Sequence, residues 1–310
     1  RAKLAEMAIR TFALESMLYR TGGYLDAVFS ADFLTQRRGD AKSEIQDLKS
    51  KTSDPGEDSD TRRREHSREH EDGQRGDGPD QEREAQAEQE GLRSAAEEYA
   101  IECAICKVFA TETLDFVVDE ALQIHGGYGF SEEFPVAQAY RDARVFRIFE
   151  GTNEINRLTI VDQLRRRVKA GRISMDLAPA AGVPGGHIVH DVHRTPAAAV
   201  AAALQCAHGR FGQNLMAEQE IVGNIADLAI GAYAIESAAR RATQTDRPAA
   251  RSAAEFLTAN ATVLAAARLA AVVRGCGDVG PASVALPTTE TVALRRQVAD
   301  AVLERDGYPW

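Results

Sequence analysis

Apolar residues recur at spacings of three and four along most of this chain, and this periodicity limits the fold to helices. Leu4, Met7, Phe12 and Leu18 mark one helical face, and the same period returns after residue 92. No run alternates apolar and polar residues with the two-residue period of a half-buried strand. Aromatic residues make up only 6% of the 310 residues while Ala is abundant, which favours helix over sheet. We predict an all-α fold, with one helical bundle followed by a second helical domain.

Composition and turn residues divide the chain into five segments. The predicted segments are a first helix at 1–34, weakened at Gly22-Gly23; a charged disordered insert at 35–91; further bundle helices at 92–170; a linker at 171–195; and a helical extension at 196–310. Breaks near Gly209–Gly212, Asp246–Pro248 and Gly275–Pro287 predict four helices in the extension. Between Asp40 and Glu90 about 17 acidic residues stand against about nine basic ones. This composition cannot bury enough apolar surface to order itself.

Net charge and apolar content limit the partners and the location. The formal charge of −10 argues against a nucleic-acid-binding surface, which needs clustered Lys and Arg. No apolar run reaches the ~20 residues of a membrane span, and no secretory signal is visible, so a cytoplasmic location is expected. The helical pattern begins at Arg1, so we expect a fragment cut within a domain. Cys103 and Cys106 are interpreted as thiols on the face of a buried helix, in a reducing compartment.

Glu150 is the strongest candidate for chemistry. It falls between a short helix predicted at about 136–149 and a helix predicted at 154–169, next to Phe146, Ile148 and Phe149. A carboxylate partly desolvated by these side chains would have a raised pKa and could act as a general base. The alternative is an exposed loop glutamate, which the residues alone favour. Thr152 and Asn153 are suitable caps for the helix that follows, with Glu154 in its first turn.

Gly126-Gly127-Tyr128-Gly129 has two interpretations. A phosphate-binding loop would follow a strand and keep the order GxGxxG, whereas this run follows a helix. A helix C-cap and turn is therefore favoured.

The stretch from Ala121 to Leu158 closely resembles the C-terminal helical domain of the acyl-CoA dehydrogenase flavoenzymes. The resemblance rests on Gln123, Gly126-Gly127-Tyr128-Gly129-Phe130, Phe134-Pro135, Arg141-Asp142, Glu150-Gly151-Thr152-Asn153-Glu154 and Arg157-Leu158. Weaker similarity reaches back to Leu92 and across the insert to Lys3–Tyr24. The form of the Glu-Gly-Thr motif and the long tail resemble the very-long-chain branch.

The resemblance implies a role for each matching residue. Glu150 would take the pro-R α-proton of a fatty acyl-CoA, a β-hydride would pass to FAD, and trans-2-enoyl-CoA would form. Gly151 would lie against the thioester. Thr152, Asn153 and Glu154 would contact FAD, and Gln123, Ile124, His125, Gly126 and Gly127 would contact the ADP half of an FAD bound to a neighbouring subunit. The resemblance also implies a homo-oligomer, which is a dimer in this branch. It further implies that electron-transferring flavoprotein accepts the electrons and that the reaction belongs to fatty-acid β-oxidation.

The family's N-terminal helical domain, β-rich middle domain and Arg-x-x-Phe-Gly motif have no counterpart here. We therefore expect that the chain alone does not hold FAD tightly or turn over. Two alternatives stay open, an acyl-CoA oxidase-like enzyme that uses oxygen and a non-catalytic helical assembly module.

The resemblance implies that the segment 171–194 corresponds to a loop that associates with membrane in the very-long-chain branch. It is rich in Gly and Pro and carries little basic charge, so a solvent-exposed linker is favoured over peripheral membrane contact. His187, His190 and His193 are regularly spaced, but a zinc site is not favoured because no further ligand cluster lies near them.

Overall fold

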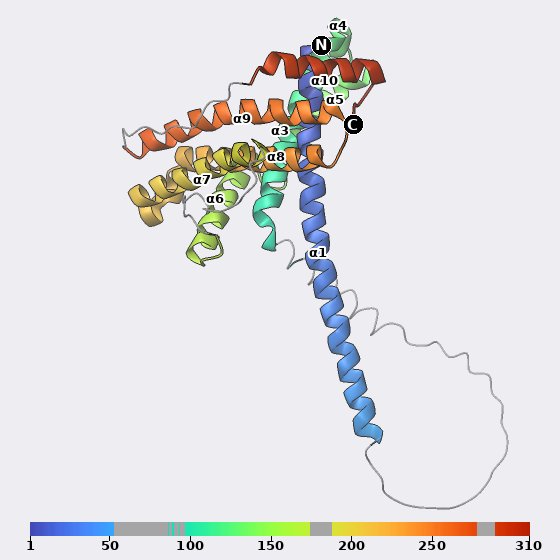
Figure 1. Ribbon diagram of the computed structural model, residues 1–310, viewed down its shortest axis with the longest axis vertical. Coiled ribbons are helices and arrows are strands. Elements are labelled where there is room, and N and C mark those ends of the chain that lie inside the picture. Colours follow the sequence, from blue (N-terminus) through green and yellow to red (C-terminus); the bar gives the residue numbers. More distant parts are fainter. Residues whose placement is uncertain (53–85, 87–88, 90–92, 94–96, 174–187, 278–288) are drawn as a thin grey trace, which may run out of the picture. The chain divides into compact units, whose positions relative to one another are not determined.

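Every regular element that the computed structural model describes is a helix, which confirms the all-α prediction (Figure 1). The structure describes residues 1–52, 97–173, 188–277 and 289–310 together with residues 86, 89 and 93, and it describes side chains there except for 29–52 and 188–196. The helices are α1 (Ala2–Thr52), α3 (Ala100–His125), α4 (Gly127–Phe130), α5 (Pro135–Val145), α6 (Asn153–Lys169), α7 (Ile188–Phe211), the 3-10 helix η1 (Gly212–Ala217), α8 (Gln219–Thr243), α9 (Pro248–Gly275) and α10 (Thr291–Arg305).

The chain forms two compact units. The first contains Arg1–Thr21 and Ala100–Trp310, and the second contains Gly22–Tyr99. Helix α1 is longer than predicted, because it continues through Gly22-Gly23 and past residue 34 to Thr52. Residues 36–51 are mostly good helix formers, so local propensity explains the extra length. Residues 53–85 of the insert predicted to be disordered lie outside the described residues.

The helices before and after the predicted linker share one hydrophobic core in the first unit. Buried side chains from α3, α6, α7, α8 and α9 form a single cluster, which includes Val108, Ile160, Leu204, Ile225 and Val272. The predicted linker at 171–195 therefore does not separate two hydrophobic cores. The helix that follows it begins at Ile188, earlier than expected, and residues 174–187 lie outside the described residues.

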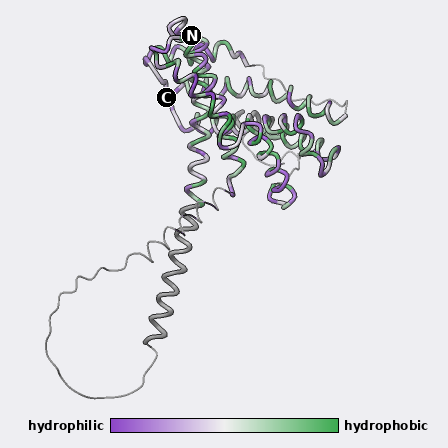
Figure 2. Tube along the Cα trace, turned by 180° about the vertical axis from the view of Figure 1, so that it is seen from behind, coloured by the Kyte–Doolittle hydropathy of each residue, from purple (hydrophilic) through white to green (hydrophobic). Residues whose placement is uncertain are grey.

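The four helices predicted in the extension are confirmed within the described part of 196–310, as α7 to α10. Helix α7 ends at Phe211, α8 ends just before the break predicted at Asp246–Pro248, and α9 ends at Gly275. Apolar and polar residues are interspersed along the helices of this unit (Figure 2).

The C-terminal tail closes the first unit against the start of α1. The Trp310 ring meets the Phe12 ring edge-on, with 4.7 Å between the ring centroids. The Tyr308 hydroxyl donates to the Glu15 carboxylate over 2.7 Å, and Arg247 donates to the carbonyl of Pro309. The beginning and the end of the chain are therefore held together by packing and hydrogen bonds.

By length and composition alone, α8 and α9 could each cross a membrane, which the sequence did not lead us to expect. In the structure both belong to the bundle, and 61% of the most apolar window of α8 and 39% of that of α9 are buried. Core helices commonly have such a composition. The absence of a membrane span therefore stays a prediction.

Candidate functional site

The turn between α5 and α6 has an unusual backbone. Glu150 adopts a φ of 53° and Gly151 a φ of 82°, both in the left-handed region. Among the described residues, Glu150 and Asp306 alone combine a positive φ with a side chain. A non-glycine residue pays a steric cost in this region, and such conformations occur most often where function requires them.

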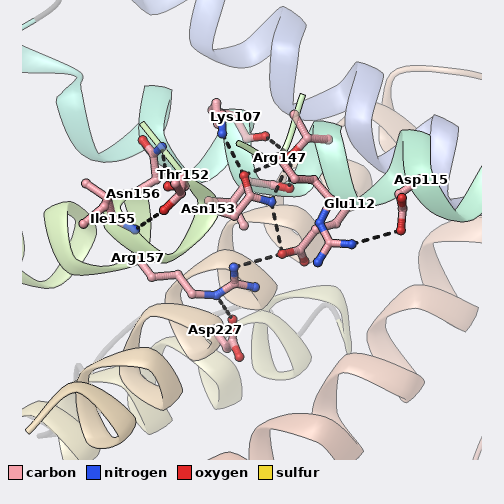
Figure 3. A network of polar contacts seen from close by, with 12 residues as sticks. Lys107, Glu112, Asp115, Arg147, Thr152, Asn153, Ile155, Asn156, Arg157 and Asp227 are labelled. Atoms are coloured by element: carbon pink, nitrogen blue, oxygen red, sulfur yellow. Dashed lines mark hydrogen bonds and ion pairs between the residues drawn. The ribbon is translucent and has the colours of Figure 1, made fainter. Parts of the chain in front are cut away.

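Hydrogen bonds from α3 and α6 fix this turn (Figure 3). The ammonium group of Lys107 on α3 donates to the carbonyl of Gly151 over 2.7 Å and to Oδ1 of Asn153 over 2.8 Å. The side-chain amide of Asn156 donates to the same carbonyl over 2.8 Å, and the backbone N–H of Asn153 donates to the carbonyl of Arg147. The turn is therefore rigid on the side that faces the bundle.

Asn153 is the buried centre of these contacts and is only 1% exposed. Its Nδ2 donates to Oγ1 of Thr111 over 3.0 Å and to Oε1 of Glu112 over 3.3 Å, and its Oδ1 accepts from Lys107. The sequence predicted Asn153 as a cofactor contact. The structure does not present it to a ligand, because the helix start turns the amide inward and the chain's own groups satisfy it. Asn153 instead positions the turn.

Arg157, one turn along α6, extends the network to the extension. Its guanidinium pairs with Glu112 over 2.9 Å and with Asp227 of α8 over 2.8 Å (Figure 3). Asp227 also pairs with Arg268 of α9 over 2.9 Å. Burial by itself would lower the pKa of Arg157, but the bonds to Glu112 and Asp227 outweigh it and raise this pKa. Arg157 thus remains charged and links three helices.

Glu150 itself is exposed, so the predicted desolvation of its carboxylate is wrong for this chain. Its apolar neighbours are open to solvent as well, since Phe146 is 41%, Ile148 53% and Phe149 39% exposed. Phe146 and Phe149 meet edge-on at 5.2 Å and form an apolar surface, but they do not cover the carboxylate.

The start of α6 agrees with the sequence prediction. Thr152 is the N-cap, and its hydroxyl oxygen accepts a hydrogen bond from the backbone N–H of Ile155. Glu154 is exposed in the first turn, where a hydrogen bond from its own backbone N–H, and then one from Thr152, lower the pKa of its carboxyl group. Polar groups are therefore available at this helix end.

The predicted contacts from Gln123 to Gly127 lie together at the end of α3, and all five residues are exposed. The helix ends at His125, and Gly126 turns the chain with a φ of 61°, which confirms the predicted turn. Gly129 packs so closely on α3 that a Cβ there would lie 2.4 Å from the carbonyl oxygen of Leu122. The glycines therefore serve the turn itself and leave its outer face open.

Sequence reasoning missed the residues of α3 that support the Glu150 turn. Lys107, Thr111 and Asp115 follow one another at intervals of four, so they lie on one face of α3, and Asp115 pairs with Arg147 over 3.1 Å. These polar residues at intervals of four on a largely apolar helix were the sequence signal that could have identified them.

Two family models match the chain. Both are described as "Acyl-CoA dehydrogenase, C-terminal domain", and they match residues 83–165 and 199–278. The first match contains the Glu150 turn with its supporting helix, and the second contains Asp227 and Arg268. The chain belongs to the acyl-CoA dehydrogenase family. A probable acyl-CoA dehydrogenase of Bacillus subtilis (strain 168) is 42% identical over 161 residues, which are 46% of this chain and 26% of that protein.

Two further relatives show how much of an acyl-CoA dehydrogenase this chain matches. The human very long-chain specific acyl-CoA dehydrogenase is 47% identical over 72 residues, 23% of this chain and 11% of that protein. An acyl-CoA dehydrogenase from Bacillus anthracis, solved as a complex with FAD, superposes with a TM-score of 0.75 at 26% identity, over 99% of this chain and 49% of that one. The aligned residues thus cover only 26% of the Bacillus subtilis protein and 11% of the human one, and this chain spans about half of the Bacillus anthracis structure.

Proposed function

We propose that the protein to which this chain belongs dehydrogenates a fatty acyl-CoA between its α and β carbons, with FAD as cofactor and Glu150 as the base. Family membership supports the reaction class, and the Bacillus anthracis relative was solved with FAD. The observation that carries the proposal is the left-handed backbone of Glu150, held in place by Lys107 and presented outward. A strained position with a free carboxylate is expected at a catalytic residue.

The residues present fit one side of such a cofactor site. Gly126 and Gly127 are exposed, and a Cβ at either position would meet no atom within 4 Å, so a large ligand can approach the backbone there. Thr152 and Glu154 provide polar groups at the start of α6. Bound FAD supplies the acceptor for the hydride and its electron pair.

The chain's own part in the reaction is proton removal and positioning. A carboxylate oxygen of Glu150 takes the α-proton of the thioester, the electron pair of that C–H bond forms the new double bond, and the β-hydrogen leaves as hydride. Abstraction of so weak an acid requires a dry pocket. Since Glu150 is exposed here, its cover must come from outside the described residues, and Phe146 and Phe149 offer the apolar surface on which that cover would pack.

The finer details rest on the resemblance. We propose a long-chain substrate, electron transfer to electron-transferring flavoprotein and a homodimer, because the long helical extension resembles that of the very-long-chain branch. A cytoplasmic location completes the proposal.

Exchange of the α-proton tests the role of Glu150. The whole protein is loaded with FAD and incubated with palmitoyl-CoA in deuterated water without an electron acceptor, and mass spectrometry measures deuterium at the α-carbon. We expect exchange in the unmodified protein and in Glu133→Gln, an exposed carboxylate before α5, and none in Glu150→Gln although its flavin spectrum is retained. Exchange in Glu150→Gln would assign the base elsewhere.

A further inference from the structure

A cavity lies in the first unit, apart from the Glu150 turn. It has a volume of about 530 Å³ and is bounded by residues of α1, α3, α6, α8, α9 and α10. No residue between 123 and 154 lines it. Its size is that of a pocket for a small organic ligand, for which ~300–1,000 Å³ is typical.

The walls of this cavity are mainly aliphatic and aromatic. Ile9 of α1, Phe109 of α3, Leu228 of α8 and Leu257 of α9 line it, and Leu264 of α9, which is 63% exposed, lies at its open side.

Three carboxylates and four arginines line the cavity. Each carboxylate is paired with an arginine, because Glu6 pairs with Arg10, Glu112 with Arg157, and Asp227 with both Arg157 and Arg268. The lining contains a fourth arginine, which is paired with none of these carboxylates.

Arg295 of α10 is that fourth arginine. It is partly buried and has no hydrogen bond or ion pair with any residue that the structure describes, whereas its neighbour Arg296 is exposed and lines no part of this cavity. A partly desolvated guanidinium is a strong site for a bidentate anion such as a carboxylate.

We infer that this cavity binds a linear aliphatic carboxylate, with the chain against Phe109, Leu257 and Leu264 and the carboxylate on Arg295. A single negative charge matches the one unpaired cation, and an unbranched chain matches the apolar walls. None of the proposed site residues between 123 and 154 lines this cavity, and binding there requires neither FAD nor the activity of Glu150.

Isothermal titration of the 310-residue chain with decanoate tests this inference, at concentrations below micelle formation. We expect saturable one-to-one binding, weakened about tenfold or more in Arg295→Gln, which loses the charge-assisted bonds, and unchanged within about twofold in Arg296→Gln. Decan-1-ol should bind at least about tenfold more weakly than decanoate, because it has no charge for Arg295.

A second pair of variants tests the cavity itself. Gly231 of α8 lines the cavity, and a Cβ there would meet no atom within 4 Å, so Gly231→Leu adds a side chain at the cavity wall. Gly223→Leu, on the same helix and equally free of neighbours but outside the lining, is the matched control. Decanoate should bind to the Gly223 variant only. Binding to the Gly231 variant, equal losses in Arg295→Gln and Arg296→Gln, or no saturable binding would each overturn the inference.

Discussion

Arg157 on α6 and Asp227 on α8 form a hydrogen-bonded ion pair of 2.8 Å, and this pair connects the extension to the turn that carries Glu150. Both side chains are only 20% exposed. Arg157 also holds Glu112, which in turn accepts from the buried amide of Asn153. A chain of polar contacts through four side chains thus connects the helices after residue 196 to the turn.

Asp227→Asn should therefore destabilise the chain. The substitution leaves the partly buried guanidinium of Arg157 with a weaker partner and weakens the pair with Arg268, so the free energy of unfolding should fall by about 1–3 kcal/mol. Asp300→Asn is the control, because its pair with Arg1 is open to solvent and should contribute less than about 1 kcal/mol. Urea denaturation followed by circular dichroism measures both. Equal losses would show that the Asp227 pairs do not stabilise the interior.

Asn153→Ala should loosen the turn as well as the fold. It leaves the ammonium of Lys107 and the hydroxyl of Thr111 without their buried partner, which should cost about 1–3 kcal/mol. Amide hydrogen exchange should become faster at residues 150–156. Asn260→Ala, at an exposed side chain that bonds only within its own helix, should change neither quantity appreciably. Unchanged exchange at the turn in Asn153→Ala would contradict the positioning role.

Alkaline pH should destabilise the first unit, because burial hinders the ionisation of a thiol and a tyrosine hydroxyl. Burial raises the pKa of the Cys106 thiol to about 11 and that of the Tyr233 hydroxyl to about 12, and the hydroxyl of Thr21 bonds to both groups. In the unfolded chain they ionise near their ordinary values of about 9 and 10, so above pH 9 the unfolded state loses protons that the folded state keeps. The free energy of unfolding should therefore fall as pH rises from 9 to 12, by on the order of 1–2 kcal/mol for each group.

Substitution of these groups separates their effect from that of other titrating residues. Cys106→Ala and Tyr233→Phe should each lose less stability between pH 9 and pH 11.5 than the unmodified chain. Tyr19→Phe, at a side chain that is 71% exposed, should show the full loss. The measurement is urea denaturation across this pH range, and identical slopes in all four proteins would disprove the explanation.

The helices could be predicted from sequence because local signals specify them. Thr152 as N-cap, the positive φ of Gly126 and the three breaks in the extension all follow from turn and cap chemistry, which needs no tertiary information. The end of α1 was missed because a charged segment that cannot form a core still has high helix propensity.

The candidate site was predicted less completely, because its supports come from distant parts of the chain. The role of Asn153 depends on Thr111 and Glu112, some 40 residues earlier, and that of Arg157 on Asp227, 70 residues later. Solvent exposure at Glu150 is also a tertiary property. Its neighbours Phe146 and Phe149 are apolar, but periodicity alone does not say whether anything covers them.

The strained backbone of Glu150 gives a test that needs neither cofactor nor substrate. Glycine adopts the left-handed region without steric cost, so Glu150→Gly should raise the free energy of unfolding by about 1 kcal/mol, despite the greater entropy of glycine in the unfolded chain. Glu150→Gln keeps the strain and should change stability by less than about 0.5 kcal/mol. Gly151→Ala, at a φ of 82°, should instead lower stability, because it adds a second strained residue. If Glu150→Gly were no more stable than Glu150→Gln, the turn would not be strained at this position, and the structural argument for a functional carboxylate there would lose its basis.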